Sequence, residues 1–345
     1  MEISCVDLFC GAGGLTHGLR AAGIEVEAGV DLDLACEYPY EINNQGSKFI
    51  AANVEELKGR DVVGLFRPGA YSLLAGCAPC QPFSSYSQGR DTTGDRKWGL
   101  LRSFGRLVRS VKPDFVTMEN VPQLPGHSVF DDFLKAFKGY SVWFDVVNCQ
   151  DYGVPQSRRR LVLLASKHGK IEMPLPTHSK HEQRTVRDAI GNLPSLRAGA
   201  MCEADSMHQS ATLSSLNLKR IRQSVPGGTW RDWDQSLLAD CHRRDSGKTY
   251  PGVYARMEWD KPAPTMTTLC YGYGNGRFGH PIDDRAISLR EAALLQTFPG
   301  SYKFAPDTEK NNFRVLGRLI GNAVPVRLGE VIGGAIVRHA RSLAN

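Results

Sequence analysis

Short apolar segments bounded by glycine, proline or polar residues recur along the first half of the chain. Their length and their valine and isoleucine content predict buried strands. They cover residues 3–9, 24–30, 71–75, 115–118, 140–149 and 161–165. Apolar residues at helical spacing over 15–23 and 100–111 predict helices between these strands, and the same spacing returns over 289–297. Strands that alternate with helices predict an α/β fold, with a mostly parallel sheet and helices on both faces.

The strand–helix alternation stops in the second half. A proline- and histidine-containing stretch over 174–181 is typical of a linker, and 185–194 predicts one short helix. Residues 195–255 show no clear period and mix aromatic with basic residues, namely Trp230, Trp233, Arg220, Arg222, Arg231, Arg243 and Arg244. This mixture suits nucleic-acid contact, and it equally suits a small domain with core tryptophans. We therefore expect one domain from 1–185 and 300–345 and a smaller one from 186–299.

Composition narrows the class of protein. A chain of 345 residues is long enough for a large core and for two domains. Nine cysteines at irregular spacing favour a reducing compartment over a disulfide framework, so we expect a cytoplasmic protein. The start lacks a secretory signal, and no uninterrupted apolar run reaches membrane-spanning length. The formal net charge of +6 permits a polyanionic partner without requiring one.

A glycine-rich turn follows the first strand. Gly11, Gly13 and Gly14 lie between that strand and the next helix, an arrangement that brings backbone N–H groups close to a ligand. The second strand ends at Asp31 and Asp33, about twenty residues further on, where a carboxylate can hold ribose hydroxyls. The glycine spacing departs from the dinucleotide pattern, so we expect an adenosine ligand without pyrophosphate. The alternative for the two aspartates is capping of the next helix.

Cys80 lies in a stiff loop after the strand 71–75, between Pro79 and Pro82. Open α/β sheets bind ligands at the carboxyl ends of their strands. The thiol is a buried structural cysteine, one member of a redox or metal-binding pair with Cys77, or a nucleophile. No second Cys/His pair with ligand spacing supports a metal, and His178 and His181 have metal-like spacing without partners. The segment alone does not choose between buried thiol and nucleophile.

Further polar residues follow later strands. Glu119 comes directly after the strand 115–118, which favours a place at the same sheet edge as Cys80. Arg158, Arg159 and Arg160 lie at the start of another apolar strand. Arg160 enters this strand, so it is less free to be an ordinary solvent-exposed charge. The polar stretch 85–99 lacks periodicity and suits either a solvated loop or a mobile lid.

Six segments in one order resemble the motif series of the DNA (cytosine-5)-methyltransferases that use S-adenosylmethionine. They are residues 7–14 (DLFCGAGG), 79–84 (PCQPFS), 119–121 (ENV), 156–160 (QSRRR), 290–299 (REAALLQTFP) and 321–325 (GNAVP). The resemblance covers most of the chain outside about 195–255. It implies a Rossmann-like S-adenosylmethionine-dependent methyltransferase fold with a second, smaller target-recognition domain. It also implies a bacterial enzyme of the restriction-modification type.

The resemblance implies roles for four side chains. Cytosine carbon 5 is a weak nucleophile until a thiolate adds to carbon 6, and Cys80 is the implied nucleophile. Glu119 would hold ring N3 and the exocyclic amine, and Arg160 would bind O2. Arg158 would support the loop or bind a phosphate. The target base would be flipped out of the duplex, and we expect the loop 84–99 to close over it.

The resemblance also implies binding residues. Those for S-adenosylmethionine, which leaves as S-adenosylhomocysteine, are Phe9, Gly11, Gly13, Gly14, Asp31, Asn53, Pro79, Asn322 and Val324. The family often has an acidic residue where this chain has Asn53, whose amide oxygen can still accept from the adenine amine. Those for double-stranded DNA are Ser84, Ser85, Thr267 and Thr268. No metal is implied.

Several functions compete with this interpretation. The expected protein is a monomer that methylates DNA, with a cognate restriction endonuclease as a functional partner. Its rivals are methylation of tRNA within the same family, a catalytically idle DNA-binding module and a C-x-x-C oxidoreductase. The long segment 195–255 favours duplex DNA over tRNA. The joint presence of Cys80, Glu119, Arg158 and Arg160 argues against an idle module.

Overall fold

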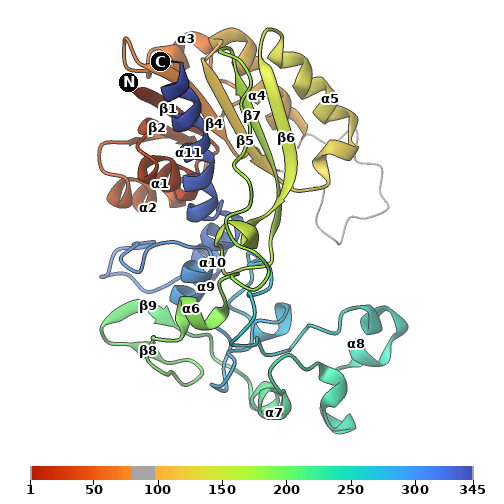
Figure 1. Cartoon of the computed structure of the whole chain (residues 1–345). Helices are drawn as coiled ribbons and strands as arrows, with labels where there is room; N and C mark the ends of the chain where they lie inside the picture. Colours follow the sequence, from red (N-terminus) through yellow and green to blue (C-terminus); the bar gives the residue numbers. More distant parts are fainter. Residues whose placement is uncertain (1, 80–97, 344–345) are drawn as a thin grey trace. The chain divides into compact units, whose positions relative to one another are not determined.

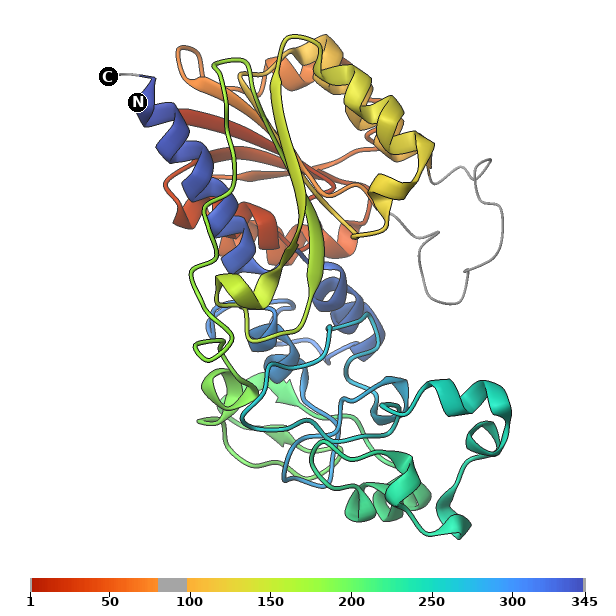
Figure 2. The ribbon, with the colours of Figure 1, turned by 45° about the vertical axis from the view of Figure 1, so that its right-hand side comes forward.

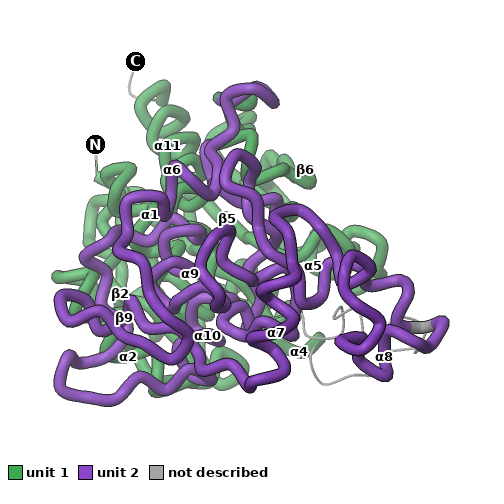
Figure 3. Tube along the Cα trace, turned by 90° about the horizontal axis from the view of Figure 1, so that it is seen from below, with its two compact units in different colours: residues 1–152, 159–177, 323–345 green, residues 153–158, 178–322 purple. Residues whose placement is uncertain are grey.

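A computed structural model of the chain describes residues 2–79 and 98–343 (Figure 1). Two compact units are present, coloured separately in Figure 3. Unit 1 comprises residues 1–152, 159–177 and 323–345, and unit 2 comprises 153–158 and 178–322. These are the bounds of the compact units; the division into a cofactor-binding domain (1–185 and 300–345) and a target-reading domain (186–299) stays a prediction about function.

Unit 1 is built on a seven-stranded sheet in the order β3-β2-β1-β4-β5-β7-β6. The strands are β1 (Ile3–Leu8), β2 (Glu25–Asp31), β3 (Lys48–Ala51), β4 (Tyr71–Gly76), β5 (Phe115–Asn120), β6 (Ser141–Asn148) and β7 (Arg159–Ser166). The pairs among β1 to β5 are parallel, whereas β7 is antiparallel to both β5 and β6. The mostly parallel sheet predicted from the sequence is confirmed.

Helices cover both faces of this sheet. They are α1 (Gly14–Ala21), α2 (Glu37–Asn43), α3 (Gly59–Val63), α4 (Gly99–Val111), α5 (Ser128–Leu134) and α11 (Val326–Ser342). In Figure 2 the blue α11 lies on one side of the sheet, and the yellow-orange α4 and α5 lie on the other. The predicted helices at 15–23 and 100–111 are confirmed as α1 and α4.

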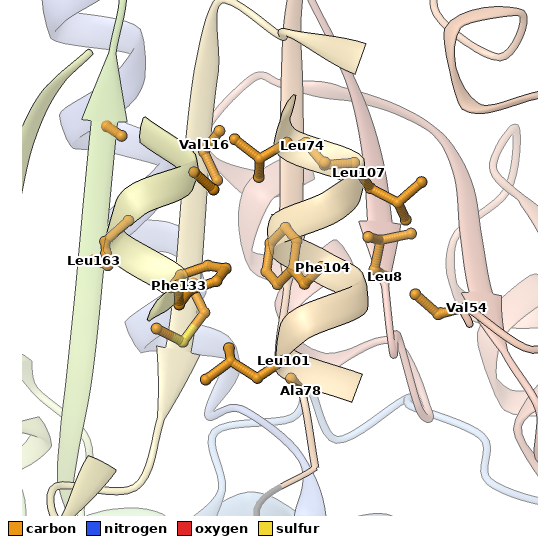
Figure 4. Close-up of a cluster of buried hydrophobic side chains, with 14 of the residues drawn as sticks. Leu8, Val54, Leu74, Ala78, Leu101, Phe104, Leu107, Val116, Phe133 and Leu163 are labelled. Carbon is orange, nitrogen blue, oxygen red and sulfur yellow. The ribbon is translucent and has the colours of Figure 1, made fainter. Parts of the chain in front are cut away.

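The larger apolar core of unit 1 lies between α4, α5 and the sheet (Figure 4). Phe104 and Leu107 of α4 and Phe133 of α5 are buried against strand residues such as Leu74 and Val116. All side chains of β1 and β5 are buried. A central strand that is covered on both faces exposes neither face to water, so its residues need not alternate between polar and apolar. This explains why β1 and β5 are almost continuously hydrophobic.

Helix α11 packs on α1 through small residues. A Cβ added at Gly18 would overlap the carbonyl oxygen of Val326, and a Cβ at Gly333 would lie 2.7 Å from the Ala22 side chain. By length and composition 313–342 could cross a membrane, but 67% of its apolar window is buried inside the protein. We therefore interpret this segment as part of the protein core and not as a membrane span. Helix α11 is not among the helices predicted from the sequence.

Unit 2 has little regular structure. Its elements are α6 (Val186–Ile190), α7 (Ser215–Gln223), α8 (Asp240–Arg243), α9 (Leu289–Leu295), α10 (Phe313–Asn322) and the two-stranded sheet of β8 (Met201–Cys202) and β9 (Asp205–Gln209). The predicted helices at 185–194 and 289–297 are confirmed as α6 and α9, shorter than expected.

The aromatic residues of 195–255 form a core. Trp230 and Trp233 are 5% and 6% exposed, and Trp230 stacks on His242 with ring centroids 4.5 Å apart. The guanidinium of the buried Arg220 lies over the rings of Trp233 and Tyr254. Of the two interpretations left open by the sequence, the core interpretation is correct for Trp230, Trp233 and Arg220.

Candidate active site

The strand register brings three side chains together at one edge of the sheet. Gly76, the last residue of β4, pairs with Met118 of β5, so the next residues along both strands, Cys77 and Glu119, are neighbours. Glu119 also pairs with Val162 of β7, and Arg160 lies two residues before Val162 on the same face. These three side chains therefore converge because of strand pairing and not because of closeness in sequence.

Each oxygen of the Glu119 carboxylate has one close polar neighbour: Oε2 accepts a hydrogen bond from Cys77, whereas Oε1 lies in an ion pair with Arg160 that does not have hydrogen-bond geometry. The Nε of Arg160 lies 2.7 Å from its Oε1, and the Sγ of Cys77 lies 2.8 Å from its Oε2. Glu119 is 2% exposed, whereas the Arg160 side chain is 15% exposed. A buried carboxylate needs such partners because desolvation strongly disfavours an isolated charge. The edge of the sheet thus presents a buried acid paired with a partly accessible guanidinium.

The chain leaving β4 is tied to β5 at a second point. The Nδ2 of Asn120 donates to the carbonyl oxygen of Ala78, 3.1 Å away. The amide of Cys77 continues the ladder by donating to the carbonyl of Leu8. Pro79 follows and is exposed. Cys77 and Ala78 are therefore held by the strand edge, two residues before the predicted nucleophile.

The glycine turn after β1 adopts a backbone that few residues accept. Phe9, Gly11 and Gly13 have φ angles of 59°, 53° and 86°, and Gly14 begins α1. A positive φ strains phenylalanine by about 1 kcal/mol or more, although its ring packs on the unit 1 core. A Cβ placed at Gly11 would meet nothing within 4 Å, so the space beside the turn is open. This shape suits close approach of a ligand to the backbone.

Asp31 lies beside that turn at the end of β2. Its Oδ2 accepts from the Gly11 amide at 2.9 Å, and its Oδ1 accepts from the Asp33 amide at 3.0 Å. Asp33 instead accepts from the Ala35 amide and caps a short 3-10 helix. The capping alternative is therefore correct for Asp33, while Asp31 remains a half-exposed carboxylate next to the glycine turn.

A second carboxylate, Asp7, is buried beneath the turn. The hydroxyl of Thr16 donates to its Oδ2 at 2.7 Å, and Thr16 also contacts the hydroxyl of Tyr40 at 3.2 Å. Within the described residues, its Oδ1 has no hydrogen-bond partner. Burial raises the pKa of Asp7 to about 7, although the Thr16 hydrogen bond opposes the shift. Asp7 therefore changes charge near neutral pH.

Asn53 organises the turn after β3. Its Oδ1 accepts from the Glu55 amide at 3.0 Å, and its Nδ2 donates to the Glu56 carboxylate at 3.3 Å. Arg106 of α4 holds the same turn by donating to the carbonyls of Val54 and Leu57. The Asn53 amide oxygen predicted to accept from a ligand thus already accepts from the backbone, and it has a second lone pair for another donor.

Arg158 belongs to unit 2 and is only 3% exposed. It donates to the carbonyl oxygens of Met266 at 3.0 Å and Gly321 at 3.4 Å. The neighbouring Gln156 accepts from the Met266 amide and donates to the side chain of Gln296 at 2.9 Å. These contacts are those of side chains that hold loops in place.

Nearly all of the chain matches the model of a protein family. Residues 3–338 match the family described as C-5 cytosine-specific DNA methylase. The chain belongs to this family.

Individual relatives agree with this assignment. The chain is 52% identical to the Type II methylase M.HgiDII of Herpetosiphon aurantiacus, over 98% of this chain and 96% of the relative. It is 30% identical to the Type II methyltransferase M1.HphI of Haemophilus parahaemolyticus, over 98% and 87%. The predicted enzyme class, a DNA (cytosine-5)-methyltransferase, is confirmed.

Solved structures confirm the fold. A protein encoded within a prophage of E. coli superimposes with a TM-score of 0.75 at 22% identity, covering 99% of this chain and 100% of that one. The S. pombe Dnmt2 methyltransferase superimposes with a TM-score of 0.63 at 17% identity and full coverage of both chains. The Rossmann-like methyltransferase fold expected from the resemblance is therefore present.

Other residues predicted for the methylase site lie outside the described residues or away from the strand edge in sequence, and their roles stay predictions. Cys80, Ser84 and Ser85, with most of the loop 84–99, lie outside the described residues. In unit 2, Thr267 and Asn322 are exposed and Thr268 is half-buried; Val324 of unit 1 is buried. Among residues 2–79 and 98–343 no group of three metal-ligating side chains is close enough to hold an ion.

Sequence reasoning missed the contacts of two residues at the methylase site. Cys77 was considered only as a partner of Cys80, and Asp7 was quoted only as part of the 7–14 motif. An acidic residue between Val6 and Leu8 in a buried strand does carry a signal, because a buried carboxylate needs a special environment. The Cys77 contact depends on pairing with β5, 42 positions away, and no local pattern reveals it.

Proposed function

We propose that this methylase transfers a methyl group from S-adenosylmethionine to carbon 5 of a flipped-out cytosine in double-stranded DNA, at a specific sequence. The observation that carries the proposal is the buried Glu119 carboxylate paired with Arg160 at the edge of the sheet. It lies at the end of β5, two strands from the glycine turn after β1. The family assignment supports the same reaction.

The proposed reaction begins at Cys80. Its thiolate adds to carbon 6 of cytosine, and electron density moves onto the ring N3–C2–O2 system. Glu119 hydrogen-bonds N3 and the exocyclic amine, and Arg160 donates to O2, where negative charge develops. Carbon 5 then takes the methyl group. Loss of the carbon 5 proton to a base expels the thiolate and restores the aromatic ring.

The turn after β1 fits the cofactor. S-Adenosylmethionine supplies an electrophilic methyl group on a sulfonium. The open space at Gly11 and the strained Phe9 allow the backbone to approach the ligand, and Asp31 offers lone pairs to ribose hydroxyls. Leu32, which is 69% exposed beside Asp31, offers an apolar surface to the adenine ring. We further assign Gly13, Gly14, Asn53, Pro79, Asn322 and Val324 to this site.

Unit 2 supplies exposed basic residues for DNA. Arg222, Arg231, Arg243, Arg244 and Lys248 are exposed around the buried aromatic core. Such residues contact phosphates, whereas base edges are read by polar side chains, for which we propose Thr267 and Thr268. Ser84, Ser85 and the loop 84–99 are proposed to contact the backbone around the extruded base.

The Type II names of the relatives support a proposal for the biological setting. We propose that the enzyme acts as a monomer in the bacterial cytosol. Methylation of its site would protect host DNA from a cognate restriction endonuclease, which is a functional partner without a required physical contact.

Two experiments test the proposal: mapping of the methylated cytosines, and trapping of the covalent protein–DNA adduct. The enzyme is expressed in a host without cytosine methylation, and 5-methylcytosine is mapped by sequencing to find the recognition site. A duplex carrying 5-fluorocytosine at the mapped position is then offered with S-adenosylmethionine. We expect a stable protein–DNA conjugate, because fluorine at carbon 5 cannot leave as a proton. Absence of the conjugate, or its persistence in Cys80→Ala, would refute the mechanism.

The rival functions give other outcomes. Methyl incorporation into tRNA and not into duplex DNA would identify an RNA methylase. Specific duplex binding without any incorporation would identify an idle module. Thiol–disulfide exchange that disappears in Cys77→Ser would identify an oxidoreductase.

A further inference from the structure

We propose that Cys77 is a positioning residue for Glu119: its thiol holds one oxygen of the carboxylate, so that the other oxygen meets Arg160. The inference rests on the proposed function, because it assigns Glu119 a part in the reaction. It assigns Cys77 a function of its own, separate from pairing with Cys80.

Strand pairing places the thiol where it can act. Cys77 and Glu119 directly follow the paired residues Gly76 and Met118 of the parallel strands β4 and β5. The contact between Sγ and Oε2 measures 2.8 Å and joins positions 42 residues apart. A Cβ at Gly76 would lie 3.0 Å from both the Leu8 carbonyl and the Phe104 ring, so the strand end cannot shift easily. The position of the thiol is therefore fixed by the sheet.

The two neighbours of the carboxylate differ in their chemistry. Arg160 brings a full positive charge to Oε1, whereas the thiol is a weak neutral donor to Oε2. A weak bond orients the carboxylate without competing strongly for it when N3 and the exocyclic amine of cytosine arrive. A second arginine at this position would neutralise the carboxylate and hold it away from the base. The thiol thus orients Glu119 and leaves it available.

Three described cysteines have a different environment from Cys77. Cys5, Cys10 and Cys270 are buried, and burial raises the pKa of each thiol. Cys77 is half-buried and contacts the carboxylate. Cys202 of β8 has similar exposure in unit 2, which makes it a matched control.

Substitutions test the role in catalysis. In Cys77→Ala we expect kcat for methylation of the mapped duplex to fall about tenfold with KM within about twofold, because a misaligned group affects the reacting complex more than binding. Cys77→Ser keeps a donor and should recover most of the rate. Cys202→Ala should match the wild type. A Cys77→Ala enzyme as active as Cys202→Ala, or a serine variant as slow as the alanine variant, would overturn the proposal.

A chemical readout tests the contact without relying on activity. An acceptor carboxylate beside the S–H disfavours the thiolate, which is the form that reacts with iodoacetamide. In Glu119→Gln we expect carbamidomethylation of Cys77, followed by peptide mass spectrometry, to become several times faster. Glu56→Gln serves as the control with an exposed carboxylate. An unchanged rate in Glu119→Gln would refute the contact, whereas a wild type without methyl transfer would refute the proposed function instead.

Discussion

The two units satisfy their buried polar groups in different ways. In unit 1 the backbone groups of seven strands bond to one another in ladders, so side chains are free to form the core and the site. Unit 2 has only short helices and two short strands. Its loops are held by buried side chains: Arg256 alone donates to the carbonyl oxygens of Ile221, Ser224, His280 and Asp283. Stability in unit 2 therefore depends on single polar side chains to a degree that unit 1 does not.

The largest effect is expected from the fully buried pair Arg285 and Glu291 of unit 2. The two guanidinium nitrogens lie 2.7 Å and 2.8 Å from the carboxylate oxygens, and neither residue is exposed. Arg285→Met leaves the carboxylate buried without its partner and should destabilise unit 2 by about 3–5 kcal/mol. Chemical denaturation with hydrogen exchange resolved by peptide measures this.

The matched control is an exposed pair in the same unit. Arg222 lies 3.1 Å from Asp284, with side chains 65% and 40% exposed. Arg222→Met should change stability by less than about 1 kcal/mol. Equal effects of the two substitutions on stability would contradict the view that buried polar side chains hold the loops of unit 2 in place.

Next in size are two pH effects of opposite sign. Asp7 of unit 1 has its pKa raised by burial from 3.8 to about 7, so the folded state holds a proton that the unfolded state releases. Its contribution is most favourable below about pH 4, is lost as the pH rises to about 7, and then stays constant. Asp7→Asn should therefore stabilise unit 1 at pH 8 by about 4 kcal/mol, and give no such gain at pH 4. A gain independent of pH would contradict this assignment.

The contribution of His280 in unit 2 depends on pH in the opposite direction. Burial lowers its pKa from 6.5 to about 4, so the unfolded state binds the proton first. The contribution of His280 is fully present above about pH 6.5 and is lost as the pH falls toward 4. In His280→Asn, hydrogen exchange of unit 2 peptides should depend less on pH between 6.5 and 4.5 than in the wild type. An unchanged dependence would exclude His280 as the cause.

A smaller effect tests the packing of α1 on α11 in unit 1. Gly18→Ala brings a Cβ into the backbone of Val326 and should destabilise by about 1–3 kcal/mol. Gly334→Ala on the same helix α11 meets only the end of the Arg338 side chain, at 3.5 Å, and should be neutral or stabilising by about 0.5 kcal/mol. Thermal melts of the two variants measure the difference in stability. A Gly334→Ala variant less stable than Gly18→Ala would contradict the tight contact between α1 and α11.

The smallest effect concerns the surface of unit 2. The exposed Arg243 and Arg244 are proposed to contact phosphates. Replacing both with glutamine should weaken DNA binding about tenfold and reduce the slope of affinity against salt by about 1–2, without unfolding unit 2. Fluorescence anisotropy over a salt series measures both quantities. An unchanged slope would remove this surface from the proposed interface.

Prediction from sequence succeeded where backbone ladders dominate. The strands β1, β4 and β5 could be found because both faces are covered and apolar residues follow one another. The glycine turn could be found because a strand, three glycines and a helix start occur in a row. Glu119 could be placed at the sheet edge because parallel strands end on one side.

Prediction failed where long-range contacts decide. The aromatic and basic residues of 195–255 show no period, and only the fold reveals that Trp230 is core while Arg243 is exposed. The partner of Cys77 is set by the register of β4 and β5. Helix α11 was missed because its glycines lower helix propensity, which packing against α1 offsets.

On the proposed role of unit 2 in reading DNA, the hexapeptide 153–158 limits how target specificity can be exchanged between related methylases. Although it is separated in sequence from 178–322, its Ser157 amide and Pro155 carbonyl both bond to Ala263, and its Gln156 bonds to the Met266 amide. A chimaera that imports 178–322 from a relative and keeps the host hexapeptide would bring two foreign surfaces together. Engineers who want a new recognition site on this scaffold should transplant both pieces as one cassette.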